Sequence, residues 1–191
     1  MPRQGFATAR RTELFDALVG LFLAEGFGHL TLDDIAARLK CSKSTLYTLA
    51  DSKEQLVRAA TVHFFRQATA MVEARVADVV GPRERMTTYL SAVGEALSVA
   101  SEQFMADLDA FAPAREVYEK NTRIAARRVH ELINEGVESG EFRKVHAVFA
   151  ADLAATMMVR IQQGGVRTAT ELDDAHAYRE LAAILTAGLS A

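Results

Sequence analysis

The sequence predicts an all-α protein of about nine helices, arranged as an N-terminal three-helix domain and a larger C-terminal helical domain. Apolar residues recur every three or four positions along nearly the whole chain, which is the period of amphipathic helices. No segment shows the strict alternation of a strand, and only three prolines interrupt the 191 residues. No repeat or flexible linker divides the chain, so we place the domain boundary inside a long helix, giving domains 1–54 and 55–191.

Local start and stop signals place the individual helices. Gly26 and Gly28 end the first helix, and Thr31 is suited to cap the second. Ser52 followed by Gln55 forms a capping-box pattern, and Pro82 is suited to a first helical turn. These signals predict helices over residues 8–25, 31–39, 42–49, 52–80, 83–100, 102–111, 113–140, 146–163 and 173–189.

Composition bounds the function classes. The N-terminus lacks the apolar segment of a secretory signal peptide, and no apolar run approaches the roughly 20 residues of a membrane span. A single cysteine, Cys41, excludes an internal disulfide, so we expect a cytoplasmic protein without membrane contact. The net charge of −3 disfavours a nucleic-acid binder weakly, but residues 1–60 carry eight basic against seven acidic side chains.

The segment from Thr31 to Leu56 carries the most functional information. Its first short helix directs Leu32, Ile35, Ala36 and Leu39 inward, and Leu46 does the same on the second helix. The second helix is otherwise rich in hydroxyls, with a lysine and a tyrosine, where a core helix would carry leucines. In a helix-turn-helix, the second helix inserts its N-terminal residues into the major groove of DNA. The pattern therefore indicates a DNA-reading helix that presents Lys43, Ser44, Thr45, Tyr47 and Thr48.

These residues also allow interpretations without DNA. Hydroxyls and lysines mainly contact phosphates, but Lys43 and Lys53 are equally compatible with ordinary solvated lysines. Tyr47 is compatible with an aromatic at the edge of the core, and Thr31 with a helix cap alone. A helical adaptor whose N-terminal motif binds protein is an alternative function.

An enzyme is the least supported alternative. The five histidines form no recognisable metal pair, and the chain has no glycine-rich phosphate loop and no GxSxG motif. Cys41 has no evident base partner, and a cysteine at a buried turn is more often a small hydrophobe than a redox switch. We therefore expect no catalytic residues, no metal and no cofactor.

Residues 8–56 resemble the DNA-binding domain of the TetR (tetracycline-repressor-like) family of transcriptional regulators. The resemblance rests on Gly26-Phe27-Gly28, on Thr31 ahead of the IAARL segment, and on the stretches 42–47 and 52–56. It implies DNA contacts by a set of polar residues on the motif, namely Thr31, Ser42, Lys43, Ser44, Thr45, Tyr47 and Lys53.

The sequence departs from the family pattern at two places. Leu49-Ala50 replaces the usual aromatic pair, whose first member commonly contacts a phosphate. Lys40 stands where glycine is usual, at a helix end that favours a left-handed conformation, and a non-glycine residue there costs roughly 1 kcal/mol.

The resemblance also implies a ligand pocket and a dimer in the C-terminal domain. We expect apolar stripes on the last two long helices to form the dimer interface, with Phe149, Leu153, Ile161, Leu181, Leu185 and Leu189. The alternative is that both stripes face the core of the same chain. Aromatic and flexible side chains are the candidate ligand contacts, namely Phe104, Met105, Leu108, Phe111, Tyr118, Met157 and Met158, although core filling explains most of them equally well.

The predicted function is thus a homodimeric regulator, most simply a repressor, that binds a palindromic double-stranded operator. A small apolar or amphipathic effector would favour a conformation whose reading helices no longer match adjacent grooves. We expect the long helix that spans both domains to transmit this conformational change.

Overall fold

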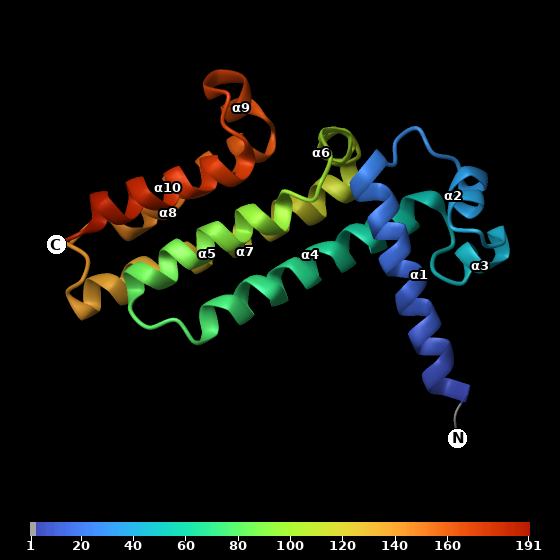
Figure 1. Ribbon diagram of the computed structural model, residues 1–191, viewed down its shortest axis with the longest axis horizontal. Helices are drawn as coiled ribbons and strands as arrows, with labels where there is room; N and C mark the ends of the chain where they lie inside the picture. Colours follow the sequence, from blue (N-terminus) through green and yellow to red (C-terminus); the bar gives the residue numbers. More distant parts are fainter. Residues whose placement is uncertain (1–2) are drawn as a thin grey trace. The chain divides into compact units, whose positions relative to one another are not determined.

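The computed structural model describes residues 3–191, with side chains described from Arg10 onward. Residues 1 and 2, which belong to the predicted domain 1–54, lie outside the described residues. The all-α prediction is confirmed. The described chain forms ten helices (Figure 1): α1 Arg3–Glu25, α2 Leu32–Arg38, α3 Lys43–Tyr47, α4 Lys53–Ala77, α5 Pro82–Leu97, α6 Glu102–Ala110, α7 Ala112–Ser139, α8 Ala147–Gln162, α9 Gly165–Thr170 and α10 Asp174–Leu189.

The tenth helix is the short α9, which the sequence did not predict. Gly164 and Glu171 flank it, both with left-handed backbone conformations. Its six residues include a glycine, a valine and two threonines, which are weak helix formers. A helix this short leaves no periodic apolar pattern, so it was missed. α1 also begins at Arg3, five residues before the predicted start at residue 8.

The chain folds into two compact units, and each unit combines two segments that are separate in the sequence. Unit 1 comprises the residues up to Arg66 together with Ala100–Tyr118, and unit 2 comprises Gln67–Val99 and Glu119–Ala191. Unit 1 therefore contains α6 and the first turns of α7 in addition to the N-terminal helices. The functional boundary at residue 54 stays a prediction.

Unit 1 is organised around aromatic rings. Phe27, in the turn between α1 and α2, has its ring centroid 5.5 Å from Phe22, 6.0 Å from Phe104 and 5.9 Å from Phe111. Phe64 of α4 meets Phe104 edge-on at 5.9 Å. Such pairs contribute beyond their buried area, so these rings hold the α1–α2 turn against α6.

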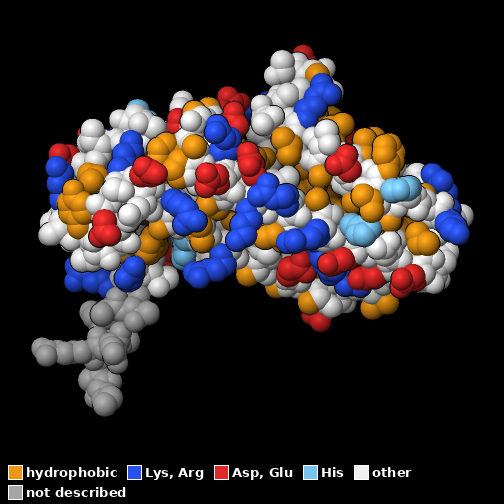
Figure 2. Space-filling view, turned by 180° about the vertical axis from the view of Figure 1, so that it is seen from behind, with side chains coloured by type: hydrophobic (Ala, Val, Ile, Leu, Met, Phe, Trp, Pro, Cys, Tyr) orange, Lys and Arg blue, Asp and Glu red, His pale blue; other side chains and the backbone are white. Residues whose placement is uncertain are grey.

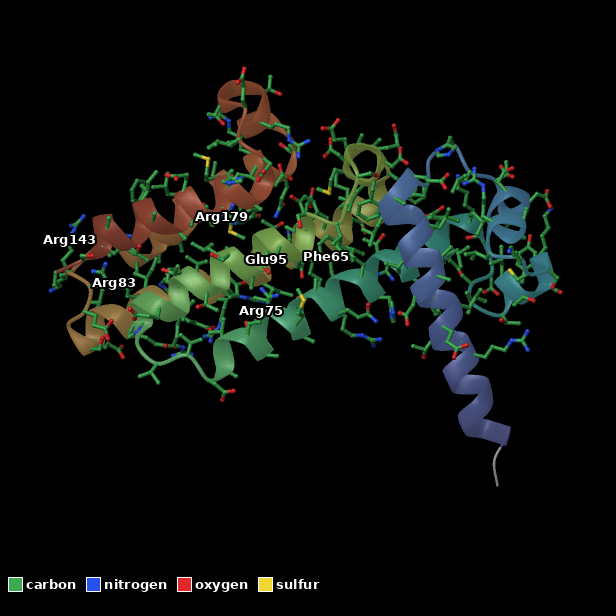
Figure 3. The ribbon with its side chains drawn as sticks, viewed as in Figure 1. Phe65, Arg75, Arg83, Glu95, Arg143 and Arg179 are labelled. Carbon is green, nitrogen blue, oxygen red and sulfur yellow. The ribbon has the colours of Figure 1, made fainter. Side chains whose placement is uncertain are left out.

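Unit 2 is a bundle in which α10 packs against α5 and α8 (Figure 1). Tyr178 of α10 is fully buried and lies over Gly94 of α5, where a Cβ atom would come within 2.8 Å of its side chain. Ion pairs join neighbouring helices at the surface of the bundle. Figure 3 shows one of them, between Arg75 of α4 and Glu95 of α5.

Candidate nucleic-acid interface

The helix-turn-helix is built by α2, the turn at Lys40-Cys41, and α3. Ile35, Ala36 and Leu46 are buried and join the two helices. The Cys41 N–H donates to the Ala36 carbonyl at 2.9 Å, which closes the turn. Lys40 has φ 50°, so the left-handed conformation expected from the sequence is present on a non-glycine residue.

Side-chain caps fix both short helices at their N-termini. The Thr31 hydroxyl accepts from the Asp34 N–H, and the Asp34 carboxylate accepts from the Thr31 N–H at 2.8 Å, a complete capping box. The Thr31 hydroxyl and backbone N–H bonds lower the pKa of Asp34. The Ser42 hydroxyl likewise accepts from the Thr45 N–H at 3.2 Å. Thr31 and Ser42, both predicted to contact DNA, are thus helix caps in the free chain.

The capping box predicted at the start of α4 differs by one residue from the ideal pattern. The Ser52 hydroxyl accepts from the Gln55 N–H at 3.1 Å, as expected. The Gln55 side-chain oxygen, however, accepts from the N–H of Asp51 at 3.2 Å, not from that of Ser52. The reciprocal bond therefore orders the segment between α3 and α4.

The outward face of α3 is polar and accessible. Ser42, Lys43, Ser44, Tyr47 and Thr48 are exposed, and the Tyr47 side chain is 50% accessible. Thr45 is half-buried, with its hydroxyl 2.8 Å from that of Ser42. The residues predicted to read DNA thus lie on one short helix and its cap, and their contacts with DNA remain a prediction.

Both lysines of the motif have partners in the free chain. Lys43 Nζ lies 2.7 Å from an Asp33 carboxylate oxygen, and this hydrogen bond raises the pKa of Lys43. Lys53 Nζ donates to the carbonyl of Gly28 at 3.0 Å, which ties the start of α4 to the α1–α2 turn. Binding a phosphate with Lys43 would therefore compete with Asp33.

Asp107 of α6 is a residue that sequence reasoning missed. One of its carboxylate oxygens accepts from the backbone N–H groups of both Phe27 and Gly28, each at 2.6 Å. The Gln103 side-chain amide donates to the other oxygen at 2.8 Å. Burial alone would raise the pKa of Asp107, but these three donors together lower it. No local signal announces this contact, because the partners lie 80 and 79 residues apart in sequence.

The candidate ligand residues are divided between the two units. Phe104, Leu108 and Tyr118 are buried in unit 1, where Met105 and Phe111 are half-buried. Met158 is buried and Met157 half-buried in unit 2. The rings of Phe104 and Phe111 pack on Phe27, so the structure supports their alternative role as core. Ligand contact by any of the seven stays untested.

The candidate dimer residues divide into exposed and buried sets. Phe149 and Leu153 of α8 are 67% and 50% exposed. Ile161, Leu181, Leu185 and Leu189 are buried within unit 2, as the core interpretation of the stripes expects. Val148 of α8 and Ile184 of α10 are also exposed, at 61% and 67%. Val148 had no periodic signal, since it lies one position from Phe149 on the same helix.

The described part of the chain gives little support to metal binding, membrane insertion or thiol chemistry. No group of three or more His, Cys, Asp or Glu side chains within it is arranged to hold a metal ion. None of its helices combines the length and apolar character needed to cross a membrane. Burial raises the pKa of the Cys41 thiol above its ordinary value, which disfavours a reactive thiolate.

Residues 14–60 match the family model described as bacterial regulatory proteins, tetR family. An uncharacterised HTH-type transcriptional regulator of Mycobacterium tuberculosis is 37% identical over 90 residues, and the match spans 44% of each chain. The HTH-type transcriptional regulator BetI of Brucella anthropi is 27% identical over 132 residues, or 68% of each chain. A solved regulator from Saccharomonospora viridis in complex with choline shares the fold with TM-score 0.75 at 18% identity, covering 96% of this chain and 99% of that one.

Proposed function

Because the chain is a transcriptional regulator of the TetR family, we propose that it binds duplex DNA as a homodimer through α3 and releases it when a small molecule binds. The chain matches less than half the length of the M. tuberculosis regulator. The observation that carries the proposal is the exposed row of donors on α3, held by caps and backed by the buried Ile35 and Leu46. Such donors contact phosphates and base edges in a major groove.

The dimer is supported by an apolar surface on unit 2. Figure 2 shows hydrophobic side chains on the surface of the unit that carries α8 and α10. Val148, Phe149, Leu153 and Ile184 are each at least half exposed. An apolar cluster of this kind on one surface marks a site of association. A second copy is the proposed occupant, because two reading helices about 34–36 Å apart meet successive major grooves.

Small residues on α10 favour close approach of the partner. Ala183, Ala187 and Gly188 are exposed beside Ile184. A Cβ atom at Gly188 would meet nothing within 4 Å in the same chain, so nothing inside the monomer requires glycine there. A partner helix lying across α10 would use this space. The proposed interface therefore consists of the exposed faces of α8 and α10, with Ile161, Leu181, Leu185 and Leu189 supporting it from below.

Release by an effector is supported by the connection between α6 and the α1–α2 turn. Asp107 holds the N–H groups of Phe27 and Gly28, and Lys53 holds the carbonyl of Gly28. A shift of α6 would therefore move the turn that positions α2 and α4. We propose a small apolar or amphipathic effector that acts on the helices following α4, and the choline complex of the S. viridis regulator shows that such a fold can hold a small molecule. A ligand with different affinity for the two arrangements would shift their populations.

Repression is the simplest consequence of this design, since a dimer on an operator occludes the promoter and an effector removes it. We also propose that the protein acts in the cytoplasm, where it would reach chromosomal DNA. No specific observation favours an adaptor function.

Binding to duplex DNA at several salt concentrations tests the proposal. The probe is a duplex selected by the protein from a random pool, with a scrambled duplex of the same composition as reference. We expect affinity to fall steeply with salt, and Tyr47→Ala and Lys43→Ala each to weaken binding at least several-fold. Affinity that is independent of salt and unaffected by both substitutions would refute DNA reading by α3 and favour a protein partner.

The oligomeric state tests the second half of the proposal. We expect wild-type protein to sediment as a dimer and Ile184→Glu to sediment as a monomer with an unchanged helical spectrum. Val80→Glu is the matched control, because Val80 is 89% exposed in the α4–α5 turn and belongs to neither α8 nor α10. If both variants sediment as monomers, or if both sediment as dimers, the proposed α8–α10 interface is wrong.

A further inference from the structure

An open pocket of about 510 Å³ lies between the end of α3 and the first turns of α4. Tyr47 forms part of its wall on the α3 side, and Arg58 and Gln55 line it from α4. Leu49 and Ala50 also line it. Leu49 is 8% exposed and so contributes little side chain to the open space, while Ala50 contributes a single methyl group. The pocket exists because this segment carries no bulky side chain that would fill it.

The polar groups facing the pocket are mostly donors. Arg58 is exposed and forms no ion pair with any side chain in the described part of the chain. The Gln55 side-chain oxygen is occupied by the Asp51 N–H, which leaves its amide NH₂ available to another partner. Tyr47 adds a hydroxyl from a half-exposed side chain. Asp51 is the acidic residue that lines the pocket, and its negative charge would repel an anion.

Arg58 differs in this respect from the two lysines of the motif. Lys43 is paired with Asp33, and Lys53 donates to the Gly28 carbonyl. Each lysine therefore already shares its ammonium group with an acceptor of the protein, and a phosphate would have to share it as well. Arg58 has no such partner to give up, and its planar guanidinium fits two oxygens of a phosphate at once. The N-terminal end of α4 next to the pocket adds the positive end of a helix dipole.

We propose that this pocket is a seat for one backbone phosphate of the bound DNA, held by the Arg58 guanidinium with the Gln55 amide and the Tyr47 hydroxyl. The inference rests on the proposed DNA binding and deepens it, because it adds Arg58 and Gln55 to the residues that the sequence predicts to contact DNA. This phosphate contact does not distinguish one DNA base from another. It fixes the register of α3 on the duplex, and Asp51 moderates its strength.

Salt dependence of binding is the discriminating measurement, because each phosphate neutralised contributes about 0.9 to the slope of log K against log salt concentration. The probes are the selected duplex and its scrambled counterpart. We expect Arg58→Ala to lower the slope by roughly one per protomer and to weaken binding to both duplexes by roughly tenfold per protomer. Arg58→Lys should keep the slope while losing part of the affinity, and Asp51→Asn should strengthen binding.

Arg127→Ala is the matched control, because Arg127 is an exposed arginine on α7 in unit 2 and its loss changes the net charge equally. An unchanged slope for Arg58→Ala, with Lys43→Ala still weakening binding, would overturn the phosphate seat and leave DNA binding intact. A loss confined to the selected duplex would also overturn it, since that result means base reading. If wild-type protein binds neither duplex, the proposed function itself fails.

Discussion

Removing the Asp107 carboxylate should loosen the α1–α2 turn in a measurable way. Asp107→Ala deletes three acceptor interactions, two of them with backbone N–H groups at 2.6 Å. A hydrogen bond to a charged group contributes about 1.5–3 kcal/mol, and partial exposure of Asp107 favours the lower end. We therefore expect Asp107→Ala to destabilise the protein by about 2–3 kcal/mol. Asp107→Asn keeps an oxygen acceptor without the charge and should cost about 1 kcal/mol.

Amide hydrogen exchange locates this effect. The Phe27 and Gly28 N–H groups donate to Asp107, so their exchange should accelerate in Asp107→Ala by more than that of amides in α8 or α10. Asp109→Ala is the control, because Asp109 is an exposed acid on the same helix, and in the described part of the chain its carboxylate accepts no hydrogen bond from a backbone N–H. Equal exchange and equal stability of the Asp107 and Asp109 variants would refute the reasoning.

The same contact predicts a pH dependence with a definite sign. The pKa of Asp107 in the folded chain lies below its ordinary value of 3.8. Its contribution to stability is therefore complete above pH 3.8 and is lost as the pH falls through the lower, folded-state pKa. The stability difference between wild type and Asp107→Asn should be constant around neutral pH and shrink in acid. A difference that grows as the pH falls below 3.8 would contradict the assignment of the carboxylate as acceptor.

Three further predictions concern the helix-turn-helix. Asp33→Asn should raise affinity for duplex DNA several-fold, because it frees Lys43 and removes an acid from a surface that faces phosphates, and titration against the selected duplex measures this. Lys40→Gly should stabilise the protein by about 0.5 kcal/mol, since the relief of a left-handed lysine exceeds the entropy cost of glycine, and a higher urea midpoint would show it. Cys41 should react with iodoacetamide at pH 7 more slowly than free cysteine, because burial raises its thiol pKa; equal rates would contradict this.

Local chemistry made the helix-turn-helix predictable from sequence. The caps at Thr31 and Ser42 and the buried positions Ile35 and Leu46 all follow from residues at most four positions apart. The left-handed backbone at Lys40 was expected from the family resemblance, because glycine is usual at this position. Helix signals of this kind act over one or two turns, so they are legible without tertiary information.

Contacts distant in sequence could not be found in the same way. In the sequence, Asp107 looks like an ordinary acidic residue on a helix. Only the folded structure shows that it accepts hydrogen bonds from the Phe27 and Gly28 amides. Periodicity also reveals that a helix has an apolar face without saying what covers it. Ile161 and Leu181 are covered by their own chain, whereas Phe149 on the same stripe as Ile161 is not.

The spacing between half-sites on the bound duplex tests the central claim most directly. If two α3 helices read DNA from one dimer, a selected duplex should bind two protomers, and its half-sites should be centred about one helical turn, or a multiple of it, apart. Inserting roughly half a turn between the half-sites should then abolish tight binding, because the second helix would face the wrong side of the duplex. Binding of one protomer, or affinity that is indifferent to this insertion, would contradict a dimeric reader built on α3.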